Sequence, residues 1–176
     1  MYLFWDALPA NSIVCAALEF VNGCALENHA DIQNIVPCSS SPSWPYYLRA
    51  KTGVAPAYSF MIFTKNVHPK LSHFIQAIAD INLFIDLTND TLSFYKESMD
   101  NEEGNYVTNR SLVHGKPPIR VLSEVADEAY AAYSRVSKSL KTQGTPEAYK
   151  AWMTFVHGYI TFHVTQGRYR LEELNI

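Results

Sequence analysis

The nonapeptide NDTLSFYKE occupies residues 89–97, near the middle of a chain of 176 residues. Within it, Asn89, Ser93 and Glu97 follow one another at steps of four. A helix turns by about 100° per residue, so these three side chains would form one stripe. An amide oxygen, a hydroxyl and a carboxylate are hard oxygen ligands of the kind that Mg²⁺ prefers, and the adjacent Lys96 could reach an oxygen of a diphosphate. A polar helix end that faces solvent has the same spacing, so the pattern alone leaves both interpretations open.

Helices are predicted both around this stretch and downstream of it. A helix is predicted over residues 70–98, which would be on the order of 40 Å long, with Pro69 in its first turn. The polar segment 99–118 is predicted to be a mobile, charged loop. Residues 119–143 are amphipathic with acids early and bases late, as the helix dipole favours, and Pro146 opens a last helix.

Two further helices are predicted nearer the N-terminus. Residues 10–29 are apolar and rich in alanine, with Asn11 or Ser12 as the N-cap. A helix over residues 46–61 contains a glycine and a proline, so a break or kink is expected inside it. The sequence has no internal repeat and almost no strand alternation. It therefore predicts an all-α fold of about five main helices in a single domain over residues 1–176.

Composition places the chain among globular proteins and excludes several classes of function. Hydrophobic residues make up 48% and charged residues 18%, and the formal net charge of -3 gives no broad basic surface for nucleic acid. No apolar run is expected to reach the roughly 20 residues that span a bilayer, and the N-terminus lacks the basic segment of a signal peptide. The three cysteines have no metal-ligand spacing and are expected to be buried thiols of a cytoplasmic protein.

Four segments resemble those of one family, in the same order along the chain. NDTLSFYKE is similar to the Asn-Ser-Glu metal motif of class I terpene synthases, in the form found in the fungal trichodiene synthase family. WPYYLRAKTG resembles the segment with that family's diphosphate-sensing arginine, which is here Arg49. FVHGYITFHVTQGRYRLEEL resembles its last helix, whose diphosphate-binding Arg-Tyr pair is here Arg168 and Tyr169. IVCAALEFVNGCALE resembles the helix that precedes the sensor segment.

This resemblance implies the helical isoprenoid-synthase fold and a role in fungal terpenoid biosynthesis. It covers only the C-terminal half of the family's members, which suggests a truncated and repurposed cyclase. The family's aspartate-rich motif, which holds further Mg²⁺ ions, belongs to the other half and has no counterpart in this sequence. Removal of a diphosphate needs concentrated positive charge, so ionisation by this chain alone is expected to be weak or absent.

A second expectation is an apolar substrate cavity with a polar rim, formed by side chains from three predicted helices. The residues assigned to catalysis in this cavity are Tyr58, Phe84, Tyr159 and His157, the last as a proton donor or hydrogen-bond partner; His163 in the same predicted helix could take this role instead. The residues assigned to substrate binding are Arg49, Phe60, Met61, Ile85, Lys96, Phe155, Phe162, Arg168 and Tyr169. For each apolar side chain alone, ordinary core packing is the competing interpretation.

Three functions stay open at this point. The preferred one is a cyclase that folds an already reactive, hydrophobic terpenoid and closes a ring without metal, as a pericyclase of the intramolecular Diels–Alder type; it requires no cofactor and leaves the Asn-Ser-Glu stripe vestigial. The alternative is a synthase of sesquiterpenes or diterpenes that removes diphosphate with Mg²⁺ at Asn89, Ser93 and Glu97, as an oligomer or with a partner chain. The third is a non-catalytic terpenoid-binding protein. Uncovered apolar faces would favour a homodimer in each case.

Overall fold

The computed structural model describes residues 1–102 and 104–174, and the regular structure in these two ranges consists of helices without any strand. The four long helices are α1 (Ala7–Glu27), α5 (Ile78–Met99), α7 (Pro118–Gln143) and α8 (Pro146–Thr165). The short ones are α2 (Ala30–Gln33), α3 (Trp44–Thr52), α4 (Ala55–Met61) and α6 (Tyr106–His114). The all-α fold predicted from the sequence is therefore confirmed.

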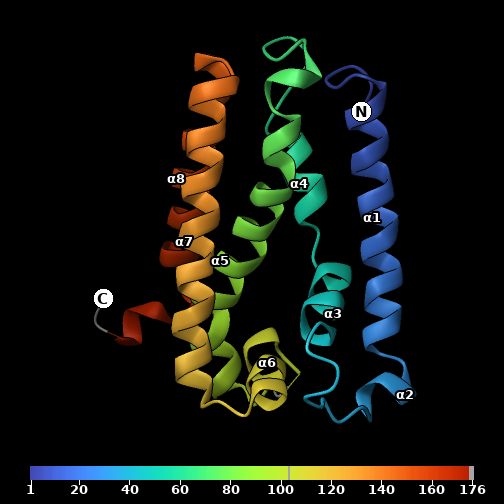
Figure 1. Cartoon of the computed structure of the whole chain (residues 1–176), viewed down its shortest axis with the longest axis vertical. Helices are drawn as coiled ribbons and strands as arrows, with labels where there is room; N and C mark the ends of the chain where they lie inside the picture. The colour runs from blue at the N-terminus through green and yellow to red at the C-terminus, as the bar shows by residue number, and fades with distance from the viewer. Residues whose placement is uncertain (103, 175–176) are drawn as a thin grey trace.

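Helix α5 lies at the centre of the molecule (Figure 1). Helix α7 packs along one side of it, α8 contacts both of these helices, and α4 packs on the other side. Helix α1 lies beyond α3 and α4 and contacts both, whereas α6 contacts α3, α5 and α7. This arrangement places the C-terminal half of α5 beside α3 and α6.

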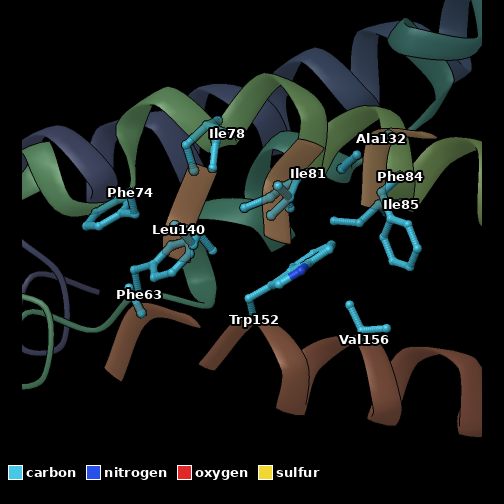
Figure 2. Packing of buried hydrophobic residues seen from close by; sticks show 14 residues of the cluster. Phe63, Phe74, Ile78, Ile81, Phe84, Ile85, Ala132, Leu140, Trp152 and Val156 are labelled. Atoms are coloured by element: carbon cyan, nitrogen blue, oxygen red, sulfur yellow. The ribbon is translucent and has the colours of Figure 1, made fainter. Parts of the chain in front are cut away.

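A core of aromatic and aliphatic side chains holds α5, α7 and α8 together (Figure 2). At its centre, Trp152 of α8 is 0% exposed and lies edge-on to Phe84 of α5, with 5.1 Å between ring centroids. The indole Nε1 donates a hydrogen bond to Oγ of Ser137 on α7 at 3.1 Å, so the polar atom of the ring is also satisfied. Large aromatic rings bury more apolar area than other side chains, and this cluster is therefore a main source of the fold's stability.

The start of α5 differs from the prediction. The segment 71–77 forms two short 3₁₀ turns, and the α-helix begins only at Ile78 and spans 22 residues. Phe74 interrupts the helix with a φ of -144°, and its buried ring stacks on Phe63 with 4.3 Å between centroids. Packing of this ring into the core replaces the helical conformation that the sequence pattern predicts.

Residues 99–118 also differ from the prediction, because they contain helix α6 instead of a loop throughout. The side chain of Asn105 accepts a hydrogen bond from the backbone N–H of Thr108 at 2.9 Å and caps the helix. Gly115 ends the helix in the left-handed conformation, with φ at 61°. Asparagine at an N-cap and glycine after the last turn are both recognisable signals, and the high polarity of the segment obscured them.

The other helix boundaries are closer to the prediction. The break expected within residues 46–61 falls between Thr52 and Ala55, where α3 ends and α4 begins. Helices α7 and α8 occupy the predicted segments. Helix α1 begins earlier than predicted, at Ala7 directly after Asp6.

Helix α1 has one buried face and one uncovered face. Ile13 and Ala16 pack against Ala57 of α4, whereas Leu18 and Val21 are each 66% exposed. Among the described residues, α1 is also the one helix that is long and apolar enough to cross a membrane by length and composition, which corrects the expectation that no apolar segment has this length. Core helices of globular proteins and signal sequences meet the same criterion, so this property alone assigns no location.

The cysteines lie nearer the surface than predicted. Cys15 on α1 and Cys38 in the loop before α3 are exposed, and Cys24 is half-buried; all three are free thiols. The expectation of buried thiols is therefore wrong, because it assumed that the apolar neighbours of these residues along the chain would also surround them in space.

His68 is a buried titratable group in the segment between α4 and α5. It is 5% exposed, its ring lies edge-on to Phe63, and burial lowers the pKa of its imidazole below the usual 6.5. The neutral ring therefore stabilises the fold above about pH 6.5, and this contribution is lost as the pH falls toward the folded-state pKa, because the unfolded chain binds the proton first. We expect the urea midpoint to fall less from about pH 7.5 to about pH 5.5 in His68→Leu than in the wild type. The exposed His157→Leu should keep the wild-type dependence, and the same dependence in His68→Leu would contradict this account.

Candidate functional site

A polar cavity of about 590 Å³ lies where α3, α5 and α6 meet the segment that follows α2. Arg49 on α3, Asn89 and Glu97 on α5, and Tyr106 on α6 are among the residues that line it. The fold thus brings the predicted sensor arginine to the same cavity as two members of the predicted metal stripe, although 40 residues or more separate them along the chain.

Arg49 joins α3 to α5 through a buried ion cluster. Its side chain is 13% exposed, its Nε donates to Oδ1 of Asp90 at 2.6 Å, and its Nη1 lies 3.2 Å from Oδ1 of Asp86. Its Nη2 donates to the backbone carbonyl of Asp86 at 3.2 Å and approaches Oδ1 of Asn89 at 3.5 Å. The arginine assigned to diphosphate sensing is therefore paired with two carboxyl groups on the helix that carries the metal stripe.

The two aspartates of this cluster were missed by the sequence analysis. Asp86 and Asp90 are four residues apart, so they share one stripe of α5. Asp86 also interrupts the apolar run LFIDL, residues 83–87. A carboxylate in an apolar helical run must find a cationic partner when it is buried, and this was the available signal.

The cluster changes the acid–base properties of its members. Burial raises the pKa of Asp86 to about 6 and the pKa of Asp90 to about 7, against the opposing effect of the Arg49 guanidinium. Burial also disfavours the cation of Arg49, but the two carboxylates outweigh it and raise the pKa of that group above its usual value. Oδ2 of Asp90 is buried without a hydrogen-bond partner among the described residues, and it is therefore a position that can hold a proton.

The predicted metal stripe lies on the side of α5 that faces the polar cavity. Asn89 and Glu97 line the cavity, and burial raises the pKa of the Glu97 carboxyl. Between them, Ser93 is 3% exposed; its Oγ has no partner at hydrogen-bonding geometry within the described ranges, although its closeness to Glu97 lowers the pKa of that carboxyl against the larger effect of burial. Residues 1–102 and 104–174 contain no group of three His, Cys, Asp or Glu side chains that could hold a metal, so a cation here would depend on an amide, a hydroxyl and one carboxylate. An unsatisfied buried hydroxyl between two such donors fits a hard cation such as Mg²⁺.

Gly53 allows the ion cluster to lie close to the end of α3. A Cβ at this position would be 2.5 Å from Nη1 of Arg49 and 2.7 Å from Oδ1 of Asp86. We expect Gly53→Ala to lower the free energy of unfolding by about 1–3 kcal/mol, because the displaced atoms belong to a buried ion pair. Gly158 in α8 is the matched control, since a Cβ there meets no atom within 4 Å, and Gly158→Ala should stabilise by about 0.5–1 kcal/mol. Urea unfolding measures both values, and a neutral Gly53→Ala would show that the cluster tolerates displacement.

The apolar residues predicted for a single cavity lie in different places. Phe84 and Ile85 are buried in the core around Trp152, which agrees with the alternative interpretation of ordinary core packing. Tyr159 packs against the same core, and its hydroxyl donates to the backbone carbonyl of Ile85 at 3.0 Å. Burial raises the pKa of this phenol, so it remains protonated and engaged. Phe60 is partly buried against the core as well.

Three other predicted residues line one apolar groove. Tyr58 and Met61 on α4 and Phe155 on α8 border a groove of about 640 Å³ that is open to solvent. A second groove of about 420 Å³ lies over α5, α7 and α8, and Phe84 contributes to its lining. The predicted pocket residues are therefore distributed over the core and two grooves, apart from the polar cavity.

The remaining predicted residues are divided between buried and exposed positions. Tyr169 is buried, and the guanidinium of Arg168 lies 5.2 Å from the centre of its ring. Arg168 itself is exposed, as are Phe162 and His157 on α8. Lys96 pairs at 2.6 Å with Glu102, which lines the polar cavity. The catalytic and binding roles of these residues stay predictions.

The histidine that reaches the metal stripe is His163 instead of His157. His163 is 1% exposed, and its Nε2 lies 3.1 Å from Nδ2 of Asn89. Its Nδ1 lies 2.8 Å from the backbone carbonyl oxygen of Tyr159, and burial lowers the pKa of the imidazole. The sequence offered both histidines of the last helix, and only the helix rotation in the folded chain separates the buried one from the exposed one.

A helical bundle that presents an Asn-Ser-Glu stripe and a buried arginine to one polar cavity has the arrangement of a terpene cyclase. The family model described as Trichodiene synthase (TRI5) matches residues 1–175, and the chain belongs to this family.

Several fungal terpene synthases are similar to the chain over nearly its whole length. Terpene synthase BipA of Cochliobolus sativus is 36% identical over 171 residues, which cover 97% of this chain and 53% of that protein. Longiborneol synthase CLM1 of Gibberella zeae is 33% identical over 177 residues, with coverages of 99% and 52%. The (E)-beta farnesene synthase of Metarhizium brunneum is 35% identical over 162 residues, with coverages of 90% and 48%. The chain thus spans about half the length of the curated relatives it matches.

Proposed function

We propose that this chain provides the diphosphate-binding part of a class I terpene synthase site, with Mg²⁺ as cofactor and a prenyl diphosphate as substrate. The observation that carries the proposal is the buried Ser93 hydroxyl, which has no partner at hydrogen-bonding geometry among the residues that the structure describes. It lies between Asn89 and Glu97, which both line the polar cavity of Arg49. When bound, Mg²⁺ supplies positive charge that stabilises a departing diphosphate. The similarity to synthases of longiborneol and (E)-beta-farnesene supports a substrate of the same chemical class.

Different residues of the chain would bind the cation and the diphosphate. Asn89, Ser93 and Glu97 would hold the cation through oxygen atoms, since all three lie on one stripe of α5. Arg49 keeps a buried guanidinium at the same cavity, and planar N–H donors of this kind suit phosphate oxygens. Lys96 pairs with Glu102 of the cavity lining and would exchange this carboxylate for an anion that enters the cavity.

Complete ionisation would need more acidic ligands than the Asn-Ser-Glu stripe supplies. The stripe has a single carboxylate, and the 176 residues include no aspartate-rich motif of the kind that the resemblance implies. We propose that further polypeptide supplies them, either from a second copy in a homodimer or from a partner chain. The uncovered face of α1 around Leu18 and Val21 is available for such an association.

A metal-independent cyclase, such as a Diels–Alder pericyclase, remains the second candidate. It is favoured by the apolar groove between α4 and α8, to which Tyr58, Met61 and Phe155 contribute. It ranks second because Phe84, Ile85 and Tyr159 lie in or against the core instead of in this groove. A non-catalytic terpenoid-binding protein would use the same groove.

The proposal is tested with the purified chain, farnesyl diphosphate and geranylgeranyl diphosphate. Release of diphosphate and calorimetric binding of inorganic diphosphate are measured with Mg²⁺ and then with EDTA. We expect binding of inorganic diphosphate to require Mg²⁺. Release of diphosphate, which should require Mg²⁺ as well, is expected only where a second copy of the chain completes the site. Glu97→Gln should weaken both signals by at least about tenfold, since it removes the one carboxylate of the stripe. Glu172→Gln, at an exposed glutamate after α8, should behave as the wild type.

The outcomes separate the candidates. Signals that persist in EDTA, or that Glu97→Gln leaves unchanged, would reject a metal site on α5. Conversion of a neutral diene-containing terpenoid that is insensitive to EDTA would instead support the pericyclase. Saturable binding of such a terpenoid without turnover would support the non-catalytic protein.

A further inference from the structure

We infer that His163 fixes the orientation of the Asn89 side-chain amide, so that Oδ1 faces the polar cavity and Nδ2 faces His163. The role of that oxygen as a cation ligand rests on the function proposed above. The orientation itself rests on hydrogen-bond chemistry within this chain.

The first argument comes from the two ring nitrogens of His163. Nδ1 lies 2.8 Å from the carbonyl oxygen of Tyr159, which can only accept, so Nδ1 must carry a hydrogen. The other nitrogen of a neutral imidazole is an acceptor. Nε2 therefore accepts a hydrogen bond from the atom of Asn89 that lies 3.1 Å away, and this atom must be the amide nitrogen.

The second argument comes from the other side of the same amide. Nη2 of Arg49 is a donor and lies 3.5 Å from Oδ1 of Asn89, at the long end of the hydrogen-bonding range. A rotated amide would place its NH₂ group against the guanidinium and its oxygen against the lone pair of Nε2. Both contacts would be repulsive, so the two neighbours select the same orientation independently of each other.

The imidazole is held firmly enough to act as such a support. Its ring lies 4.5 Å from the Tyr159 ring, 4.6 Å from the Tyr169 ring and 5.5 Å from the Phe162 ring, measured between centroids. These rings cover the imidazole. Its Nδ1 is engaged with Tyr159, and Nε2 is the ring atom that remains for Asn89. The imidazole of His163 also connects Tyr169, the tyrosine of the predicted Arg-Tyr pair, to Asn89 of the metal stripe.

Residues that orient a metal-binding side chain typically change metal affinity by about 10- to 100-fold when removed. His163 is thus a positioning residue in the site of the proposed function. His163→Phe removes the acceptor but keeps an aromatic ring, and we expect it to weaken cation binding about tenfold. His163→Gln can place an amide oxygen near the position of Nε2 and should stay within about threefold of the wild type.

Two measurements test this inference on the whole chain. Nitrogen-15 NMR of labelled histidine reports the tautomer of His163, and we expect the form with hydrogen on Nδ1. Electron paramagnetic resonance with Mn²⁺ and inorganic diphosphate then compares cation affinity in the wild type, His163→Phe and His163→Gln. Recovery of affinity in His163→Gln distinguishes the lost acceptor from damage to the fold.

The possible results are separable. Hydrogen on Nε2 of His163 would overturn the assigned amide orientation. Equal Mn²⁺ affinity in His163→Phe and the wild type, or equal losses in His163→Phe and His163→Gln, would overturn the positioning role. A wild-type chain that takes up no Mn²⁺ with diphosphate would reject the function proposed above, whereas the tautomer would still decide how Asn89 is oriented.

Discussion

Arg49→Met should lower the free energy of unfolding by about 3–5 kcal/mol, the usual cost of removing one partner from a buried charge cluster. The methionine would fill part of the space but leave the carboxyl groups of Asp86 and Asp90 without their cation. The Arg49 and Asp86 side chains are 13% and 5% exposed, so water from the adjoining cavity can replace the lost guanidinium only in part. Two nearby carboxylates in such surroundings also repel each other.

Urea unfolding at about pH 8 and about pH 5 measures this effect. The loss should be larger at the higher pH, because protonation of the two aspartates relieves the unpaired charge at the lower pH. Arg135→Met is the matched control, since it removes a pair with Asp80 whose side chains are 51% and 32% exposed. Pairs of that kind contribute about 0–1 kcal/mol. Equal losses in the two variants would show that the Arg49 cluster contributes no more than a surface ion pair.

Trp152→Ala should destabilise the fold by about 3–5 kcal/mol, the range for removal of a buried aromatic ring. Trp152 is 0% exposed and contacts side chains from both neighbouring helices in the core, including Phe84 and Tyr133. Its removal leaves a cavity and also frees Ser137 Oγ from its indole donor. Helices α5, α7 and α8 can close only part of that space, because each is fixed by further contacts.

Calorimetric or urea unfolding of purified variants checks this value. Trp152→Phe retains most of the ring and should cost less than Trp152→Ala, which keeps the test usable if the alanine variant does not fold. Tyr130→Ala is a control at a large aromatic residue that is 70% exposed, and it should change stability by less than about 1 kcal/mol. Similar losses in Trp152→Ala and Tyr130→Ala would contradict the central role of the indole.

The sequence predicted the helical class and most helix positions because these depend on local features. Gly53 lies at the break between α3 and α4, and Pro118 and Pro146 open α7 and α8. The false extension of α5 toward residue 70 has a tertiary cause, since the packing of Phe74 on Phe63 decides the backbone conformation there. Propensity over a short window cannot weigh a contact of that kind.

The positions of candidate site residues could be predicted when the residues share one helix. Contacts between residues on different helices could not. Asn89, Ser93 and Glu97 were found because their spacing alone aligns them on α5. The partners of Arg49 were not found, because pairing between α3 and α5 depends on how the helices pack. The choice of His157 over His163 has the same origin, since the rotation of α8 about its axis is set by the core around Trp152.

Most of the water around the guanidinium of Arg49 is removed when the chain folds, before any ligand arrives. An anion that enters the cavity therefore binds a guanidinium that folding has already largely desolvated. Binding does not include this free-energy cost, which is the advantage of preorganisation. The same anion competes with Asp86 and Asp90 for a limited number of N–H donors. Tighter pairing within the cluster would raise the melting temperature and weaken anion binding together. Selection for heat resistance at these positions should consequently yield more stable proteins that bind the proposed diphosphate ligand more weakly.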